Sequence, residues 1–239
     1  MMIKLGHFFF RYRNGLFPLA FAFALLVDQP AFPLGRHDLD TAFDLAGAAV
    51  AFLGLALRAL TVGYEYIIRG GRNGKVFAET LVQGGVFAHC RNPLYLGNIL
   101  IAVGLALMSQ STAFYLIFIP FILFAYASIV AAEEAYLLGK FGAEYEDYCR
   151  RVNRWWPRWA GFSRSIEGMR FNWNRVIVKE YSTTLWVIAL LPAMEVWSDY
   201  RILGESELPP APYLLAAVLA WLGLYLTVRT LKIKGCVRG

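Results

Sequence analysis

Long apolar runs alternate with short charged segments along this chain of 239 residues. A helix needs about 20 apolar residues to cross roughly 30 Å of hydrocarbon, and fewer when flanking side chains reach the interface. Six runs meet this requirement: Leu16–Leu34, Thr41–Val62, Leu94–Ser109, Thr112–Ala132, Thr184–Tyr200 and Pro212–Leu231. The pattern therefore predicts an all-α polytopic membrane protein with about six transmembrane helices.

The composition agrees with this prediction. Apolar residues make up 58% of the chain and charged residues only 17%, unlike a soluble domain. The first run follows Lys4, Arg11 and Arg13, so a signal peptide is an alternative there. No convincing small-residue cleavage site follows that run, which favours a membrane helix.

Lysine and arginine alternate between loops, as an even number of spans requires. They gather before the first predicted helix and after the second, fourth and sixth, whereas the other two loops are rich in Asp and Glu. Because positive loops stay cytoplasmic, we expect both termini and the polar site on the cytoplasmic side of the inner membrane. The net charge of +6 thus reflects topology and contact with anionic lipid, and gives no indication of nucleic acid.

Other chemistries have little support. The cysteines and histidines are few and unclustered: Cys90, Cys149, Cys236, His7, His37 and His89. Neither disulfides nor a metal site is therefore expected. The chain also lacks a nucleophile elbow, a P-loop and a GxGxxG motif.

Polar residues gather where the third and fourth apolar runs meet the cytoplasmic side. Arg91 and Asn92 precede the third run, Pro93 suits the first turn of a helix, and Glu133 with Glu134 closes the fourth run. The segment 72–87 contains turn-forming glycines and reads as an irregular loop whose main chain can approach a ligand closely. A site built across the two helices is predicted.

The chain divides into three predicted parts. Residues 1–68 hold the first two helices, 69–160 the core with the third and fourth helices, and 161–239 an amphipathic connector with the last two. Arginines interleaved with tryptophans over 150–179 are typical of a segment at the membrane surface, with Trp at headgroup depth and Arg near lipid phosphate.

Five sequence features follow one another along the chain: 81–87 (LVQGGVF), 91–97 (RNPLYLG), the pair Glu133-Glu134, 141–145 (FGAEY), and Tyr148 through Pro157. In this combination they resemble the isoprenylcysteine carboxyl methyltransferase and phospholipid methyltransferase superfamily, whose members are integral membrane enzymes that use S-adenosylmethionine. The resemblance covers roughly residues 69–157. It implies that S-adenosyl-L-methionine binds on the cytoplasmic side.

The resemblance also implies roles for individual residues. Cofactor-contacting positions, partly through main chain, are Arg72, Glu79, Thr80, Leu81, Val82, Phe87, Asn92, Pro93, Leu94, Tyr95 and Glu133. Catalytic roles fall to Arg91, which can pair with a carboxylate or phosphate, and to Glu134, which can take a proton from an amine acceptor. The alternative is that these charges only anchor helix ends.

Three departures bear on the acceptor. Phe87 stands where the carboxyl methyltransferases have Tyr, Asn92 replaces their His, and Ile129 stands where they carry an Arg for the substrate carboxylate. Asn-Pro is similar to the phosphatidylethanolamine enzymes. We therefore expect a methyltransferase acting on a lipid or other apolar acceptor, with a phospholipid headgroup amine favoured.

Alternatives remain open. They are a prenylcysteine carboxyl or small-thiol methyltransferase, an NADPH-dependent sterol-type reductase relative, and a non-catalytic membrane scaffold. The oligomeric state is open too.

Several other residues have structural or secondary interpretations. Tyr145 and Tyr148 are expected in the interfacial aromatic belt, and Arg58 as an anchor that reaches the interface. Glu195 is expected to pair helices, and Trp155 to offer an aromatic face to the cofactor.

Overall fold

The computed structural model describes residues 1–65 and 76–234, which form a bundle of helices without a strand in that described part. The helices are α1 (Met2–Val27), α2 (Asp40–Tyr64), α3 (Pro93–Ser109), α4 (Ile119–Phe141), α5 (Ala143–Arg151), α6 (Phe162–Ser165), α7 (Trp173–Leu203) and α8 (Ala211–Ile233). A π-helical turn, Phe114–Phe118, leads into α4, and short 3-10 turns occupy Pro33–Gly35, His37–Leu39, Gly85–Ala88 and Glu205–Glu207.

The prediction of an all-α membrane protein is confirmed. Among the residues that the structure describes, four helical segments are long and apolar enough to cross a bilayer: His37–Tyr64, Phe114–Phe141, Trp173–Leu203 and Ala211–Ile233. The shorter helix α3 is also apolar. Helix α1, which carries three basic residues in its first half, is not among the four, so the number of six spans stays a prediction.

Several predicted helix boundaries were wrong. Helix α1 begins at Met2 instead of Leu16, and it ends at Val27 instead of Leu34 because Pro30 disfavours helical geometry just before it. Helix α7 begins at Trp173 instead of Thr184. The side chain of Asn172 caps it by accepting a hydrogen bond from the backbone N–H of Arg175 at 2.8 Å. The predicted surface segment 150–179 therefore ends inside a helix.

Helices α2 and α3 pack at very short range because glycines face each other. A Cβ atom added at Gly54 would lie 2.6 Å from the carbonyl oxygen of Gly97, and one added at Gly47 would lie 2.6 Å from that of Gly104. Small residues at a contact between two helices let the helix backbones approach closely in membranes, where packing drives helix association. This contact fixes the frame on which the other helices lie.

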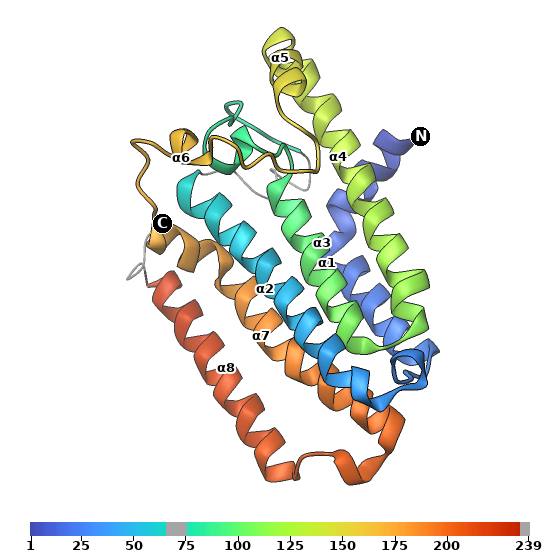
Figure 1. Cartoon of the computed structure of the whole chain (residues 1–239). Helices are drawn as coiled ribbons and strands as arrows, with labels where there is room; N and C mark the ends of the chain where they lie inside the picture. Colours follow the sequence, from blue (N-terminus) through green and yellow to red (C-terminus); the bar gives the residue numbers. More distant parts are fainter. Residues whose placement is uncertain (66–75, 235–239) are drawn as a thin grey trace.

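The remaining long helices cover the α2–α3 pair (Figure 1). Helix α1 packs against α4 through aromatic edges, such as Phe17 on Tyr126 with ring centroids 5.2 Å apart, and α7 packs against α2 and α3. Helix α8 lies outermost beside α7, with no buried residue, and Trp221 donates a hydrogen bond to the Leu185 carbonyl at 2.8 Å. Lipid would cover its apolar surface.

A charged pair lies inside this bundle. Arg58 of α2 is 6% exposed, and its guanidinium lies 2.7 Å from the carboxylate of Glu180 on α7. It also donates a hydrogen bond to the side-chain oxygen of Asn98 on α3 at 2.5 Å. The prediction that Arg58 reaches the interface was wrong, because a partner on another helix holds its charge in the interior.

One end of the bundle carries the connections that matter for the site. Helices α5 and α6, with the irregular segments around them, gather at this end, and α1 begins and α8 ends on the same side (Figure 1). At the opposite end, Asp28 joins α1 to the start of α4. The backbone N–H of Ala113 and the hydroxyl of Ser111 donate to its carboxylate and hold the pKa of Asp28 below its ordinary value.

Candidate functional site

A cavity of about 620 Å³ lies at the end of the bundle that carries α5 and α6. Its wall is formed by the irregular segment 76–82, the start of α3, the end of α4 and parts of α1, α2, α5 and α7. A cavity of this size, with mixed apolar and polar walls, is typical of a small-molecule site.

The cavity brings together residues that lie far apart in the sequence. All the predicted site residues within the described part of the chain line it: Glu79, Thr80, Leu81, Val82, Phe87, Arg91, Asn92, Pro93, Leu94, Tyr95, Glu133 and Glu134. Arg72 lies outside the described residues. Their functional roles stay predictions, but their convergence on one cavity is a property of the fold.

Glu133 and Tyr95 form one polar contact in the cavity wall. The hydroxyl of Tyr95, in the first turn of α3, donates a hydrogen bond of 2.5 Å to the Glu133 carboxylate on α4. Arg13 of α1 in turn donates to the Tyr95 hydroxyl oxygen at 3.4 Å. Three helices therefore present a carboxylate, a phenol and a guanidinium to the same region of the cavity.

Arg91 and Glu134 form a second polar contact. Their charged groups lie 3.2 Å apart, with the side chains only 13% and 15% exposed, so they pair with each other in the wall. Burial by itself would lower the pKa of Arg91, but the Glu134 carboxylate together with Cys149 and Tyr145 outweighs that effect, and the pKa is raised. Arg154 also binds Glu134 through both carboxylate oxygens, at 3.0 and 2.5 Å.

Arg91 retains an unused donor. Its Nη1 approaches the sulfur of Cys149 at 2.6 Å, whereas its Nε is buried without a hydrogen-bond partner among the described residues. A buried donor without a partner is costly unless a ligand or water supplies an acceptor.

Helix α5 closes the wall with two tyrosines. Tyr145 and Tyr148 are only 4% and 3% exposed and line the cavity, so their predicted place in the interfacial belt was wrong. The Tyr148 hydroxyl donates a hydrogen bond to the Phe87 carbonyl at 2.7 Å, which holds the loop before α3 against α5. Burial raises the pKa of both phenols, so they are neutral donors at physiological pH.

Contacts from α4 and α5 also hold the irregular segment 76–82 and the residue after it. Lys140 donates to the Ala78 carbonyl, and Gln83 donates to Glu144 at 3.0 Å. Arg151 donates to the side-chain oxygen of Gln83, also at 3.0 Å. The main chain of this segment is therefore positioned along the cavity by side chains from elsewhere in the fold.

The sequence prediction missed part of the wall. Arg13, Asn14, Arg58, Asn98, Tyr126 and Thr183 also line the cavity. Arg13 and Thr183 come from α1 and α7, outside the region of the resemblance. An arginine inside a membrane helix was the available signal, because such charges usually face a cavity or a partner.

Two aromatic side chains near the motifs, Trp155 and His89, lie outside the cavity wall. Trp155 packs against the apolar core and is not in the cavity wall. His89 also lies off the wall, where its Nε2 lies 2.8 Å from the Ser165 hydroxyl and its Nδ1 contacts the Arg158 carbonyl. Both side chains hold the segment after α5 in place.

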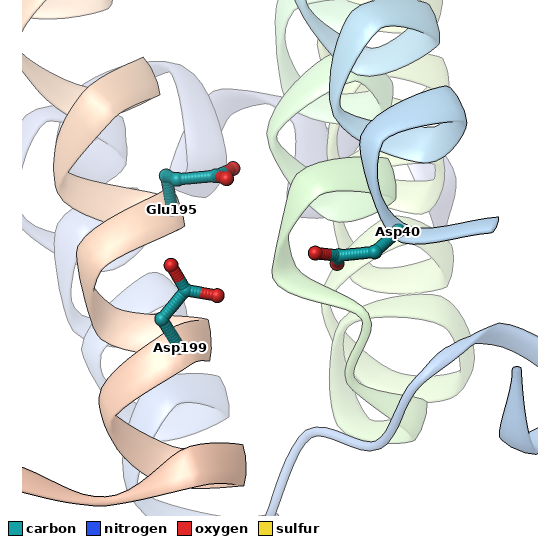
Figure 2. Close-up of side chains that lie close together, drawn as sticks. All are labelled: Asp40, Glu195 and Asp199. Atoms are coloured by element: carbon teal, nitrogen blue, oxygen red, sulfur yellow. The ribbon is translucent and has the colours of Figure 1, made fainter. Parts of the chain in front are cut away.

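A cluster of carboxylates lies at the other end of the bundle. Asp40 of α2 faces Glu195 and Asp199 of α7, and their oxygens all lie within 4.8 Å of one another (Figure 2). The oxygens of nearby Asp44 are buried without a hydrogen-bond partner among the described residues. Acidic groups of this kind are common without an ion, so the cluster by itself does not define a metal site.

The fold defines an integral membrane protein with a cavity, partly lined by polar residues, at one end of a helical bundle. Residues 44–144 match the family model for phospholipid methyltransferases. This match confirms the resemblance drawn from the sequence motifs. No solved structure matches the chain.

Three curated relatives are similar to parts of the chain. The cobalt-zinc-cadmium resistance protein CzcN of Cupriavidus metallidurans is 32% identical over 80 residues, which cover 34% of this chain and 37% of that protein. The nickel-cobalt-cadmium resistance protein NccN of Alcaligenes xylosoxydans xylosoxydans is 28% identical over 123 residues, which cover 52% of this chain and 55% of that protein. The protein-S-isoprenylcysteine O-methyltransferase of Schizosaccharomyces pombe is 29% identical over 89 residues, which cover 37% of this chain and 36% of that protein. The chain thus spans about half the length of these relatives or less.

Proposed function

We propose that this protein transfers a methyl group from S-adenosylmethionine to a lipid acceptor, preferably a phospholipid headgroup amine, on the cytoplasmic side of the inner membrane. The observation that carries the proposal is the single cavity in which the motif residues of α3, α4 and the segment 76–82 converge. The family match over residues 44–144 supports methyl transfer as the reaction class.

The residues of the cavity fit the proposed cofactor. The unpartnered Nε of Arg91 suits a carboxylate, Glu133 suits an amino group or ribose hydroxyls, and the main chain of 78–82 suits close contact with an extended ligand. When bound, S-adenosylmethionine supplies an electrophilic methyl group carried by a sulfonium. The faces of Phe87 and Tyr95 can tolerate that positive charge, at about 0.5–2 kcal/mol each.

The chain contributes mainly by positioning the reactants and excluding water. Glu134 already accepts hydrogen bonds from Arg154 and pairs with Arg91. We therefore assign it the role of orienting Arg91, in place of the proton-accepting role expected from sequence. An acceptor amine would have to lose its ammonium proton to solvent before reacting, and its nitrogen would then take the methyl group that the bound cofactor would supply, leaving the cofactor as a neutral thioether.

A prenylcysteine carboxylate is the second candidate acceptor, because the Schizosaccharomyces pombe relative carries that activity in its name. Incubation of purified protein with methyl-labelled cofactor and separate pools of lipid extract and a farnesylcysteine analogue would distinguish the two. We expect label in a lipid amine. Label that enters only the farnesylcysteine analogue would refute the phospholipid acceptor.

Cofactor binding is tested on its own by calorimetry of the detergent-solubilised protein. Glu133→Ala should weaken binding of S-adenosylmethionine about 10- to 100-fold, because a charge-assisted hydrogen bond contributes about 1.5–3 kcal/mol. The matched control is Glu167→Ala, since Glu167 is exposed and outside the cavity wall.

Unchanged affinity of the Glu133→Ala variant would remove Glu133 from the site. Binding of NADPH in place of S-adenosylmethionine would indicate a reductase, and binding of neither would indicate a scaffold.

A further inference from the structure

The three arginines in the cavity wall differ in how their charges are neutralised. Arg58 lies 2.7 Å from Glu180, and Arg91 lies 3.2 Å from Glu134. Arg13 has no carboxylate within ion-pair distance among the described residues, although it lines the same cavity. Arg13 is therefore the arginine of this wall that forms no ion pair among the described residues, and it connects to the Glu133 carboxylate through the Tyr95 hydroxyl.

The Arg13 guanidinium is held in place by contacts that occupy few of its N–H donors. It lies over the ring of Phe10, 4.5 Å from the ring centroid, and donates one long hydrogen bond of 3.4 Å to Tyr95. A guanidinium has five N–H donors, so most of them remain for a ligand. Stacking on an aromatic ring limits the entropy that an anion would have to remove on binding.

Arg13 lies beside the proposed cofactor position. Its hydrogen bond to Tyr95 places it one side chain away from Glu133, because Tyr95 donates to that carboxylate. Any anionic group bound by Arg13 would hold the rest of its molecule next to the reacting methyl group. This is where a methyl acceptor has to be positioned.

The cavity also reaches the surface on the side of α1. Asn14 lines the cavity and is exposed, and the exposed side chains of α1 after Asn14 are apolar, including Leu19 and Phe23. A lipid could place its headgroup beside Asn14 and Arg13 while its acyl chains stay along this apolar surface in the bilayer.

We propose that Arg13 binds the headgroup phosphate of a phospholipid acceptor and so positions the amine of that headgroup in the cavity. This inference rests on the proposed function for the identity of the reaction, but the binding step can be measured without turnover. The residue lies outside residues 44–144, so it adds to the acceptor site a cation that the matched region lacks.

The test compares Arg13→Gln with Arg11→Gln. Arg11 is an exposed arginine on the same helix that lies over Tyr12 and does not line the cavity. Both variants lose one positive charge, so general attraction to lipid changes equally. Binding of dihexanoyl phosphatidylethanolamine, dihexanoyl glycerol and inorganic phosphate is measured by calorimetry, with S-adenosylmethionine as the readout of an intact fold.

We expect Arg13→Gln to bind phosphatidylethanolamine about 10- to 100-fold more weakly than the wild type, with cofactor binding unchanged. Dihexanoyl glycerol, which has no phosphate, should bind all three proteins alike, and Arg11→Gln should behave as wild type. Arg13→Lys should recover part of the affinity, because charge returns without the planar fork. In turnover, the apparent KM for the phospholipid should rise more than kcat falls.

Equal affinity of Arg13→Gln and wild type for phosphatidylethanolamine would overturn the proposal. Loss of S-adenosylmethionine binding in Arg13→Gln would also overturn it, because Arg13 would then belong to the cofactor site. Inorganic phosphate that binds as tightly as the lipid would assign Arg13 to free phosphate and refute the lipid. Binding that depends on Arg13 without any methyl transfer would leave this inference standing and contradict the proposed function.

Discussion

The role of each arginine in the cavity wall depends on whether the fold pairs it with a carboxylate. Arg58, Arg91 and Arg13 all line one cavity, yet the first two are paired with Glu180 and Glu134. Removing one partner of a buried ion pair leaves an uncompensated charge, which costs more than the pair contributes. The Arg58 pair therefore stabilises the structure around the site, whereas Arg91 keeps one unpartnered N–H for a ligand and Arg13 forms no ion pair among the described residues.

Cys90 gives a prediction at the same scale. It is fully buried next to the cavity wall, and burial raises the pKa of its thiol from 9.0 to about 11. Between these two values the unfolded chain loses the proton while the folded chain keeps it, so stability falls as pH rises. Full ionisation of the unfolded state would remove about 2–3 kcal/mol by pH 11.

The measurement is the free energy of unfolding of the solubilised protein between pH 8 and 11, for wild type and Cys90→Ala. The variant should be less stable at pH 8 because it leaves a small void, but its stability should fall less steeply with pH. The buried tyrosines contribute equally to both proteins. Identical slopes would mean that the thiol ionises as readily in the folded state as in the unfolded one.

At the scale of elements, the glycine contact between α2 and α3 determines where the site residues lie. The start of α3 carries Asn92, Pro93 and Tyr95 into the cavity, and α2 carries Arg58. A displacement of either helix would separate these groups. Backbone that approaches this closely cannot shift without losing packing on the opposite faces.

Gly54→Ala should therefore destabilise the protein by about 1–3 kcal/mol, as expected for overpacking in a filled interior. The added Cβ would meet the carbonyl oxygen of Gly97 at 2.6 Å, and backbone has little freedom to move away. The matched control is Gly139→Ala, in α4, where an added Cβ meets nothing within 4 Å. The control should be neutral or up to about 1 kcal/mol more stable through helix propensity.

Thermal unfolding in detergent compares these variants, with cofactor binding as a second readout. If Gly54→Ala and Gly139→Ala have the same stability, the two helices are not in the close contact described here.

At the scale of the whole molecule, the arrangement of helices has two distinct ends. Helices α5 and α6 lie at one end with the start of α1 and the end of α8 (Figure 1), and the cavity wall is built at this end. The carboxylate cluster, near the start of α2 and toward the end of α7, lies at the other end. Lysine and arginine are concentrated in the segments at the cavity end. This asymmetry predicts that the cavity faces the cytoplasm.

Single cysteines introduced in a background with all native cysteines replaced by alanine test this orientation. Ser163→Cys lies at the cavity end in α6, and Glu205→Cys lies in the connection between α7 and α8; both native residues are exposed. In intact cells, a membrane-impermeant maleimide should label Glu205→Cys alone. After permeabilisation it should label both, and the reverse pattern in intact cells would place the cavity on the outer side.

The sequence by itself determined the membrane class, the helical elements and the motif residues of the cavity. Apolar runs read as helices because a bilayer admits few other ways of satisfying backbone hydrogen bonds. Arg91, Tyr95 and Glu133 could be predicted because they lie in recognisable local motifs. Helix ends were less accurate: the charges of α1 suggested a start at Leu16, but the helix continues through them from Met2.

Only the tertiary structure decided which charges meet. Arg58 and Glu180 are 122 residues apart, and Arg13 and Tyr95 are 82 apart. Tyr145 and Tyr148 became buried because α5 folds back over the loop before α3. Such contacts depend on the packing register of helices that are distant in sequence. A local pattern of hydrophobic and polar residues specifies that a helix has a polar side chain, and the neighbouring helices then determine what that side chain contacts.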